Sequence, residues 1–534
     1  MYFWFQLQHF ETVNLNTMKT SRLILSFAAI LLITLMGSCK NESPVTSSLP
    51  RSVPEAEGVS SEAIITFLDS AATSRHEFHS FMFLRHGKVI AEGWWDPYMP
   101  ELRHTLYSTS KSFTSTAVGF AVSEKLLNVN DKVISFFPDQ LPDSVSPFLA
   151  DMTVKDLLTM SAGQSPEPTG AIQSSGKDWV KSFLAYPVTN DPGTTFLYNS
   201  MATFMLSAIV QKVTGEMLID YLKPRLFGPL GIEGMEWEIS PDGINTGGWG
   251  LLLKTEDMAK FGQLYLQKGL WNDKQVIPAN WVEEATTFKI DQAPDALQSK
   301  RDSSDWLQGY CYQFWRCRNN AFRADGAFGQ FIIVMPEKDA VIAITTESPD
   351  MQDEINMVWK YLLPAMMDET LVENIEASET LKKRLLSLAL PLPAKVPESP
   401  LALELSSKTF TLERNDLRFE FLSLKFSGDT CHLSMIADNT DYSIPFGAGN
   451  WAIGQTVLAG PNILSRHGAL SMNRTAGSFT WKDENTLELV LRYIESPHSI
   501  RMTCKFDREN VEINMHLSIP PGTDLPPIKG KMTQ

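Results

Sequence analysis

The sequence predicts an α+β fold, in which an antiparallel sheet flanked by helices, with a helical subdomain, precedes a separate all-β domain. Two strand pairs far apart in the chain support this prediction. Apolar runs at 80–84 and 88–91 flank a His-Gly turn, and apolar runs at 331–335 and 341–345 flank a Pro-Glu-Lys-Asp turn. Helical segments occupy the interval between the pairs, so we expect one sheet whose strands come from both ends of a domain.

The helices between these strand pairs are indicated by apolar periodicity and by glycines that would end them. Helices are predicted at 108–127, 153–163, 203–213 and 356–366. The first contains several small residues, which favours close packing inside a core. We also expect an extended strand at 309–315, where apolar and other residues alternate.

The chain has 534 residues, which is more than a single hydrophobic core usually accommodates. Several prolines between 391 and 400 have the composition of a linker, and short strand-like runs such as 431–435 and 486–491 follow them. We therefore expect five parts: a signal segment (1–39), a polar leader (40–60), a first domain (61–370), a linker (371–400) and a small all-β domain (401–534). Nothing in the last part suggests chemistry of its own.

The composition of the chain argues against nucleic acid as a partner. The formal net charge is −16 and the pI is near 5.1, whereas nucleic-acid binding needs clustered Lys and Arg. A hydrophobic content of 43% is typical of a compact globular protein.

The N-terminal region has the pattern of a bacterial secretory signal. Two positive charges in 18–22 precede an apolar run at 23–36 that is shorter than a membrane span, and Gly-Ser-Cys follows. Small residues before Cys39 resemble the lipobox of lipoproteins, so we expect Cys39 to carry a lipid anchor and the chain to face the periplasm at the cell envelope. Release into the periplasm by ordinary signal peptidase is the alternative. Met18 is a candidate for the true start.

The other cysteines and the histidines suggest neither a disulfide framework nor a metal site. Cys431 and Cys504 form the only pair worth testing as a disulfide. His76-Glu77-Phe78-His79 lacks the further ligands of a zinc site, and we interpret these two histidines as surface residues.

The segment 106–113 reads Leu-Tyr-Ser-Thr-Ser-Lys-Ser-Phe and contains Ser108 and Lys111. Residues three apart share a helical face. A serine needs a base to remove its proton, and a buried, neutral lysine can be that base. A helix N-terminus also offers N–H groups to an oxyanion. The same pair fits an ordinary helix start with Ser108 as cap and Lys111 solvated.

Two further motifs lie at element ends. Tyr198-Asn199-Ser200 leads into a helix, and Tyr198 can act as a base if positive charge from Lys111 lowers its pKa. The segment 323–330, Arg-Ala-Asp-Gly-Ala-Phe-Gly-Gln, precedes an apolar strand, and its glycines permit a substrate to approach the strand edge. Each motif by itself also fits a structural role.

Together and in this order, the three motifs resemble those of the serine β-lactamase and penicillin-binding-protein superfamily, in its class C-like esterase and peptidase branch. The resemblance covers roughly residues 61–367. It implies that Ser108 is the nucleophile, Lys111 its proton acceptor and Tyr198 the group that carries a proton to the leaving group. It also implies an oxyanion hole formed by the N–H groups of Ser108 and Ala327, and no cofactor. The segments 153–163, 226–232 and 247–262 also resemble supporting segments of this family.

Two departures from the family pattern bear on the substrate. Ser200 stands where Asn is usual, which is more similar to the aminohexanoate-oligomer (nylon) hydrolases and related esterases. Ala324-Asp325-Gly326 stands where the family has Lys-Thr-Gly or His-x-Gly, and Asp325 would repel a carboxylate ligand. We therefore expect little or no β-lactamase activity, and a small-molecule or peptide substrate that is neutral or carries an amine near Asp325.

The predicted function is a serine hydrolase that cleaves an ester or amide bond through an acyl-enzyme on Ser108. No histidine occurs between His104 and His432, and Ser108 lacks the glycines of a nucleophile elbow, so a Ser-His-Asp triad is disfavoured. The alternatives are a D-Ala-D-Ala carboxypeptidase, a true β-lactamase and, from another class, an inactive lipoprotein that binds cell-wall fragments or peptides.

Overall fold

The computed structural model describes residues 48–396, 399–406, 408–463 and 472–533. The predicted signal segment, residues 40–47 of the polar leader and the lipidation candidate Cys39 lie outside the described residues.

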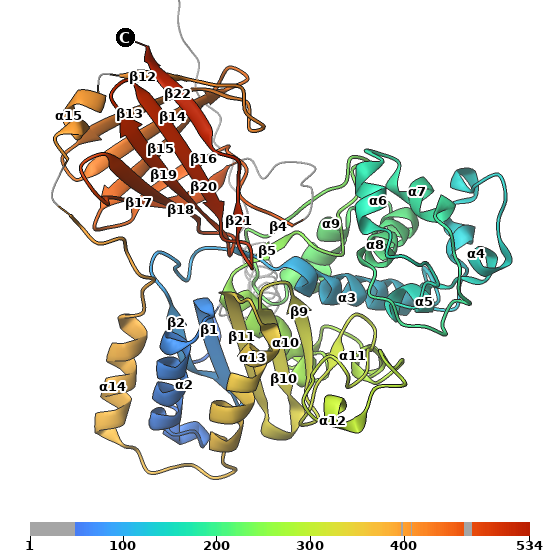
Figure 1. Ribbon diagram of the computed structural model, residues 1–534. Coiled ribbons are helices and arrows are strands. Elements are labelled where there is room, and N and C mark those ends of the chain that lie inside the picture. Colours follow the sequence, from blue (N-terminus) through green and yellow to red (C-terminus); the bar gives the residue numbers. More distant parts are fainter. Residues whose placement is uncertain (1–47, 397–398, 407, 464–471, 534) are drawn as a thin grey trace, which may run out of the picture. The chain divides into compact units, whose positions relative to one another are not determined.

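A six-stranded sheet forms the centre of the first domain, with the strand order β2-β1-β11-β10-β9-β8 (Figure 1). Its strands are β1 Glu77–Arg85, β2 Lys88–Trp94, β8 Trp315–Arg316, β9 Phe322–Gly326, β10 Gln330–Met335 and β11 Ala340–Glu347. All neighbours in this sheet are antiparallel, and Phe81 of β1 pairs with Ile344 of β11. The prediction of one sheet built from both ends of the domain is confirmed.

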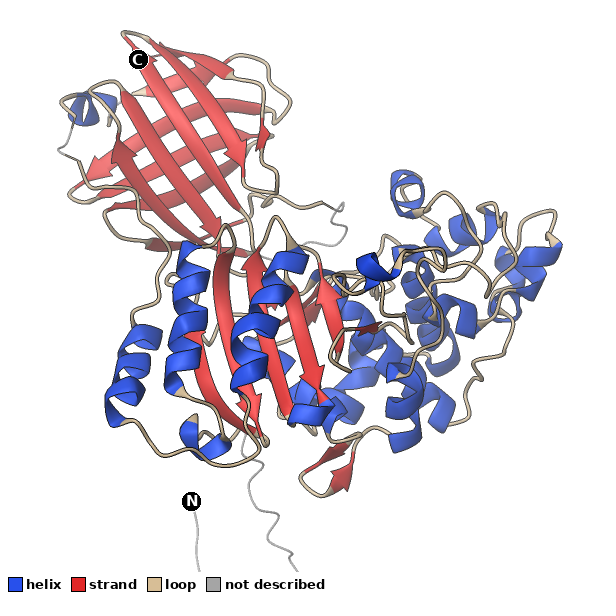
Figure 2. Cartoon of the chain, turned by 60° about the horizontal axis from the view of Figure 1, so that its bottom comes forward, coloured by secondary structure: helices blue, strands red, loops and turns tan. Residues whose placement is uncertain are grey.

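Helices cover both faces of this sheet (Figure 2). On one face pack α2 Ser61–Thr73, α13 Met351–Met357 and α14 Ile375–Leu386. On the other lies α10 Thr255–Leu266. Because both faces are covered, the central strands are buried along their length and read as apolar runs rather than alternating ones.

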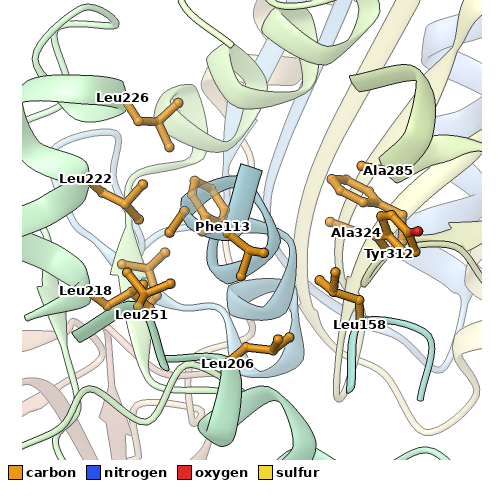
Figure 3. Packing of buried hydrophobic residues seen from close by; sticks show 14 of the residues in the cluster. Phe113, Leu158, Leu206, Leu218, Leu222, Leu226, Leu251, Ala285, Tyr312 and Ala324 are labelled. Atoms are coloured by element: carbon orange, nitrogen blue, oxygen red, sulfur yellow. The ribbon is translucent and has the colours of Figure 1, made fainter. Parts of the chain in front are cut away.

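A helical subdomain lies between β3 and α10 in sequence, and α3 runs through its core. Its helices are α3 Ser110–Ser123, α4 Pro147–Asp151, α5 Val154–Leu158, α6 Thr169–Ser174, α7 Trp179–Ala185, α8 Ser200–Thr214 and α9 Leu218–Leu222. Figure 3 shows Phe113 of α3 on the side of Leu222 and Leu226, whereas Ala324 of β9 lies with Tyr312. In the described part of the chain no single helix is long and apolar enough to cross a membrane, although the bent pair of α8 with 218–227 meets the length and composition test.

Short elements complete the first domain. They are the three-stranded sheet of β3 His104–Thr105, β5 Leu251–Leu253 and β4 Glu236–Trp237, the hairpin of β6 Leu270–Trp271 and β7 Lys274–Gln275, and the helices α11 Ala279–Thr286 and α12 Gln298–Arg301.

The structure corrects several predictions in this domain. The strand expected at 309–315 is mostly a loop, and the observed strand β8, Trp315–Arg316, begins only at its last residue. The aromatic rings of this loop pack into the core. The helix expected at 356–366 begins earlier, with α13, and continues as a π-helical segment, Val358–Leu362, and a 3-10 turn, Leu363–Ala365. The expected linker 371–400 contains α14. His76 and His79 are buried, not on the surface, because each ring nitrogen finds a partner inside the fold.

The C-terminal strands form a closed β-barrel, which confirms the predicted all-β domain. They are β12 Thr409–Leu412, β13 Phe419–Ser427, β14 Thr430–Ala437, β15 Thr440–Ala448, β16 Ala452–Thr456, β17 Asn473–Trp481, β18 Thr486–Tyr493, β19 Ser499–Asp507, β20 Asn510–Leu517, β21 Thr523–Asp524 and β22 Ile528–Thr533, preceded by the short helix α15 Leu401–Leu405. Pairing of β15 with β17 closes the ring, and apolar side chains fill its interior.

The cysteines in the described ranges, Cys311, Cys317, Cys431 and Cys504, are buried free thiols, so the candidate disulfide is not formed.

Candidate active site

Ser108 lies in a single 3-10 turn, Tyr107–Thr109, that leads directly into α3. The turn is anchored on both sides, since Leu106 N donates to Leu251 O at 2.9 Å and Thr109 Oγ1 donates to Gln330 O at 2.6 Å. Its neighbours are buried, whereas Ser108 stays partly exposed. The turn therefore presents one hydroxyl at the surface of an otherwise closed core.

Lys111 lies one turn further along and is 1% exposed. Its Nζ donates to Ser108 Oγ at 3.2 Å, to Ser200 Oγ at 3.1 Å and to Gly248 O at 2.6 Å. Residues three apart at the start of a helix share one face, which brings the amine toward the hydroxyl. All three acceptors are neutral oxygens.

These surroundings set the charge of the amine. Burial lowers the pKa of Lys111 to about 7, while the more distant carboxylates of Glu167 and Asp325 raise it. An amine with a pKa close to neutrality is free to accept a proton at physiological pH, which is the property a general base requires. Gly248 permits this contact, because a Cβ there would lie 3.3 Å from Lys111 Nζ and 2.7 Å from Ser200 O.

Tyr198 lies on the other side of the hydroxyl. Lys111 Nζ is 5.0 Å from the centroid of its ring, and its phenol hydrogen-bonds to Ser108. Burial raises the pKa of Tyr198 well above its usual range, the charge of Asp325 raises it further, and the Ser108 hydrogen bond acts in the opposite direction. The predicted lowering of this pKa by Lys111 is wrong, because burial of the phenol is the largest influence on it and acts in the opposite direction. The structure instead presents a protonated phenol beside a weakly basic amine.

The second motif is positioned by the start of α8. Asn199 caps the helix, with its Oδ1 accepting from Met201 N at 2.9 Å and from Ala202 N at 3.1 Å. Ser200 is thereby turned toward Lys111. Its own N–H donates to Glu167 Oε1 at 3.2 Å, a carboxylate that the sequence did not single out and that suits a helix N-terminus.

The third motif places backbone beside Ser108. A Cβ on Gly326 would lie 2.1 Å from Leu106 O and 3.1 Å from Thr109 Oγ1, so only glycine allows the end of β9 to pack against the Ser108 turn. Ala327 follows at once. The segments that carry the N–H groups of Ser108 and Ala327 therefore lie against each other.

Asp325 is not the free negative charge that the sequence suggested. Arg323, two residues away on the same face of β9, donates its Nε to Asp325 Oδ2 at 3.0 Å, and both residues are buried. Burial raises the pKa of Asp325 and Arg323 opposes this. The guanidinium also lies over the rings of Trp306 and Trp315, at 4.2 and 5.4 Å. Ala324 points the other way, into the core that contains α3 (Figure 3).

Comparison with known proteins identifies the family of the first domain. Residues 78–363, more than half of the chain, match the family model described as Beta-lactamase. The chain belongs to the Beta-lactamase family. As a member of this family of hydrolases, it is 25% identical over 290 residues to the 6-aminohexanoate-dimer hydrolase of Paenarthrobacter ureafaciens, covering 51% of this chain and 73% of that protein.

The chain is also similar to other proteins. The chain is 20% identical over 309 residues to a β-lactamase of Escherichia coli K12, covering 49% of this chain and 81% of that one. Among solved structures, an octameric penicillin-binding protein homologue from Pyrococcus abyssi matches with a TM-score of 0.46 and 17% identity over 85% of this chain and 97% of that chain.

Within this Beta-lactamase-family domain the structure places the predicted catalytic and substrate-binding residues close together, whereas Cys39 lies outside the described residues. Lys111 contacts the hydroxyls of both Ser108 and Ser200, and the ring of Tyr198 lies beside its amine. The end of β9 with Gly326 packs against the Ser108 turn. Sequence reasoning missed Glu167 and the pairing partner Arg323, although Arg323 and Asp325 stand at the i, i+2 spacing that places them on one face of a strand.

Proposed function

We propose that this chain is a serine hydrolase that cleaves ester or amide bonds through an acyl-enzyme on Ser108. The observation that carries the proposal is the contact of Lys111 Nζ with Ser108 Oγ at 3.2 Å, within a buried environment whose hydrogen-bond acceptors are neutral. Such an environment supplies the base that a serine hydroxyl needs.

The reaction begins when Ser108 Oγ attacks the substrate carbonyl carbon and its proton passes to Lys111. The negative charge that develops on the carbonyl oxygen is accepted by the N–H groups of Ser108 and Ala327. As the carbon–leaving-group bond breaks, the leaving group takes the phenolic proton of Tyr198, which is replenished by the proton on Lys111. Water, deprotonated by the same groups, then attacks the ester on Ser108 and releases the acid.

The charges of the site favour a neutral acyl group. Asp325 is paired with Arg323, which removes the reason to expect an amine on the substrate, and Ala324 offers no cation to a carboxylate. Aromatic rings of Phe196, Tyr198 and Trp315 pack together beside Ser108 and supply apolar surface. The relative named 6-aminohexanoate-dimer hydrolase supports an amide among the candidate substrates.

The test uses the full chain from residue 40 onward with a fluorophosphonate probe and, separately, a fluorescent penicillin. Ser108→Ala is the test variant, and Ser123→Ala, an exposed serine on the same helix, is its control. We expect the phosphonate adduct on Ser108 by mass spectrometry, its retention in Ser123→Ala and its loss in Ser108→Ala, with little penicillin labelling. Labelling by both probes would favour a carboxypeptidase or β-lactamase. Labelling by neither would favour the binding lipoprotein.

We also propose that the enzyme is held at the bacterial cell envelope, facing the periplasm, by a lipid on Cys39. The support is the pattern of residues 18–39 in the sequence. Membrane fractionation of cells that express the wild-type chain or Cys39→Ala tests this, and we expect the variant to leave the membrane fraction.

A further inference from the structure

The C-terminal barrel reaches the first domain through the loop 494–498, which joins β18 to β19. Thr105 N, in the strand that leads to Ser108, donates to Glu495 O at 2.9 Å. Arg492, at the end of β18, forms a two-pronged ion pair with Glu77 of β1 at 2.5 and 2.9 Å, and it is nearly buried. Buried bidentate contacts of this kind fix geometry. The loop is therefore a fixed part of the region around β3.

His498 is the innermost side chain of this loop and is fully buried. Its Nδ1 lies 2.5 Å from Glu347 Oε1, and its Nε2 lies 2.6 Å from the hydroxyl of Tyr107. Ser518, also from the barrel, donates to the same Glu347 oxygen at 2.8 Å. A carboxylate on one ring nitrogen orients an imidazole and leaves the other nitrogen for a second partner. That second partner of His498 is the residue immediately before Ser108.

The residues that His498 contacts have unfavourable backbone conformations. Tyr107 has φ of 46° and Phe328 has φ of 66°, both in the left-handed region that side chains other than glycine seldom adopt. Their rings lie edge-on to the imidazole, with centroids 5.9 and 4.8 Å away. Tyr107 precedes Ser108 and Phe328 follows Ala327, so one imidazole contacts the neighbours of both proposed oxyanion donors.

We propose that the barrel completes the catalytic site, with His498 as a positioning residue that holds the Ser108 and Ala327 N–H groups in the geometry of the oxyanion hole. Glu347 orients the ring, the hydrogen bond to Tyr107 fixes the peptide that enters Ser108, and the contact with Phe328 fixes the peptide that leaves Ala327. This inference rests on the proposed function, and it assigns to the C-terminal domain a part in catalysis that its sequence did not suggest.

The test compares three substitutions in the full chain with an activated ester as substrate. Tyr107→Phe removes only the hydroxyl, His498→Phe removes both polar contacts, and His498→Gln keeps a polar group. The control is His516→Phe, an exposed barrel histidine whose Nδ1 lies 2.8 Å from Asp524. Steady-state kinetics, thermal unfolding and inhibition by an arylboronic acid, which forms a tetrahedral adduct on a catalytic serine, are measured for each.

We expect kcat to fall by about 10–100-fold in Tyr107→Phe and His498→Phe with KM little changed, because misplacing a group that acts in the transition state by about an ångström costs roughly that much. Boronate affinity should fall in parallel, His498→Gln should recover part of kcat, and His516→Phe should match the wild type. Since Tyr107→Phe keeps the ring and its packing, a fall in kcat in this variant would reflect lost positioning of Ser108 rather than unfolding.

The inference is overturned if folded Tyr107→Phe and His498→Gln keep wild-type kcat and boronate affinity, or if kcat falls only in proportion to the fraction unfolded. A wild-type chain that neither labels with the phosphonate nor hydrolyses the ester contradicts the proposed function itself, which distinguishes the two failures.

Discussion

Lys111 and Arg323 are two buried cations of one site, and they differ in what surrounds them. Lys111 donates to the hydroxyls of Ser108 and Ser200 and to a backbone carbonyl, whereas Arg323 is paired with the carboxylate of Asp325 and covered by tryptophan rings. Burial lowers the pKa of Lys111 to about 7, and the carboxylates of Glu167 and Asp325 oppose this only partly. The pKa of Arg323 is raised; burial opposes this, and neighbouring Cys317 and Asp325 favour it.

The presence or absence of a direct counter-ion distinguishes the structural role of Arg323 from the proposed chemical role of Lys111. Desolvation penalises charge, and a direct counter-ion removes most of that penalty. A buried lysine without a counter-ion becomes a base, while a buried arginine with one remains charged and holds a strand in place. Substitutions at the two cations and at their neighbours should therefore differ in effect, with the largest loss at Lys111 and the smallest at Ser200.

Substituting the unpaired cation should remove catalysis. We expect Lys111→Met to lower kcat/KM for an ester by about 10³-fold or more, because the serine loses its base. Lys111→Arg should be as inactive, since a guanidinium cannot become neutral near pH 7. Esterase kinetics measure this, with circular dichroism as the control for folding. Activity in Lys111→Arg above about a tenth of wild type would contradict the role of Lys111 as base.

The same amine should give the enzyme a pH dependence. Acylation should rise as pH increases through about 7, the pKa of Lys111. Because the unfolded lysine keeps its proton to about pH 10, the unfolded state binds more protons than the folded state between these values, and the contribution of this group to stability rises with pH there. Denaturant titrations at pH 7 and 9 should show a smaller rise for Lys111→Met than for wild type.

Substituting the paired cation should affect stability more than chemistry. Arg323→Met leaves Asp325 buried without its partner, and we expect a loss of about 3–5 kcal/mol in the free energy of unfolding. The double variant Arg323→Met/Asp325→Leu should regain most of it, since both charges are then absent. Urea unfolding of the single and double variants measures the coupling. Equal losses of unfolding free energy in the single and the double variant would show that the ion pair does not stabilise β9.

Tyr198→Phe tests the proposed proton donor, whose ring lies beside Lys111. We expect kcat for an amide to fall by about 10²-fold or more, because a poor leaving group needs the phenolic proton. An ester with a nitrophenol leaving group, which departs without a proton, should lose less. The ratio of the two losses is the measurement, and an equal loss with both substrates would assign Tyr198 another role.

Ser200→Ala should have the smallest effect. It removes one of three acceptors around Lys111, which corresponds to about 1 kcal/mol or a several-fold loss in kcat/KM. Ser123→Ala, on the exposed end of α3, serves as control and should be neutral. A loss as large as that of Lys111→Met would indicate that Ser200 itself carries the proton.

The sequence by itself determined the local parts of this protein. The spacing of Ser108 and Lys111, the two apolar strand pairs and the alternating tail predicted the sheet, the order of the motifs and the all-β domain, because these depend on the period of a helix or a strand. The Tyr-Asn-Ser segment was placed correctly at a helix start, where Asn199 caps α8.

Only the tertiary structure decided the charges of the site and the contacts that the barrel makes with it. The pKa of Lys111 depends on burial against Gly248 and Ser200, and the charge of Asp325 is compensated by Arg323. His498 lies 390 residues after Ser108 and meets its turn only because the loop 494–498 docks against β3. Spacing along the chain fixes which residues share a face, whereas burial and charge pairing are set by long-range packing.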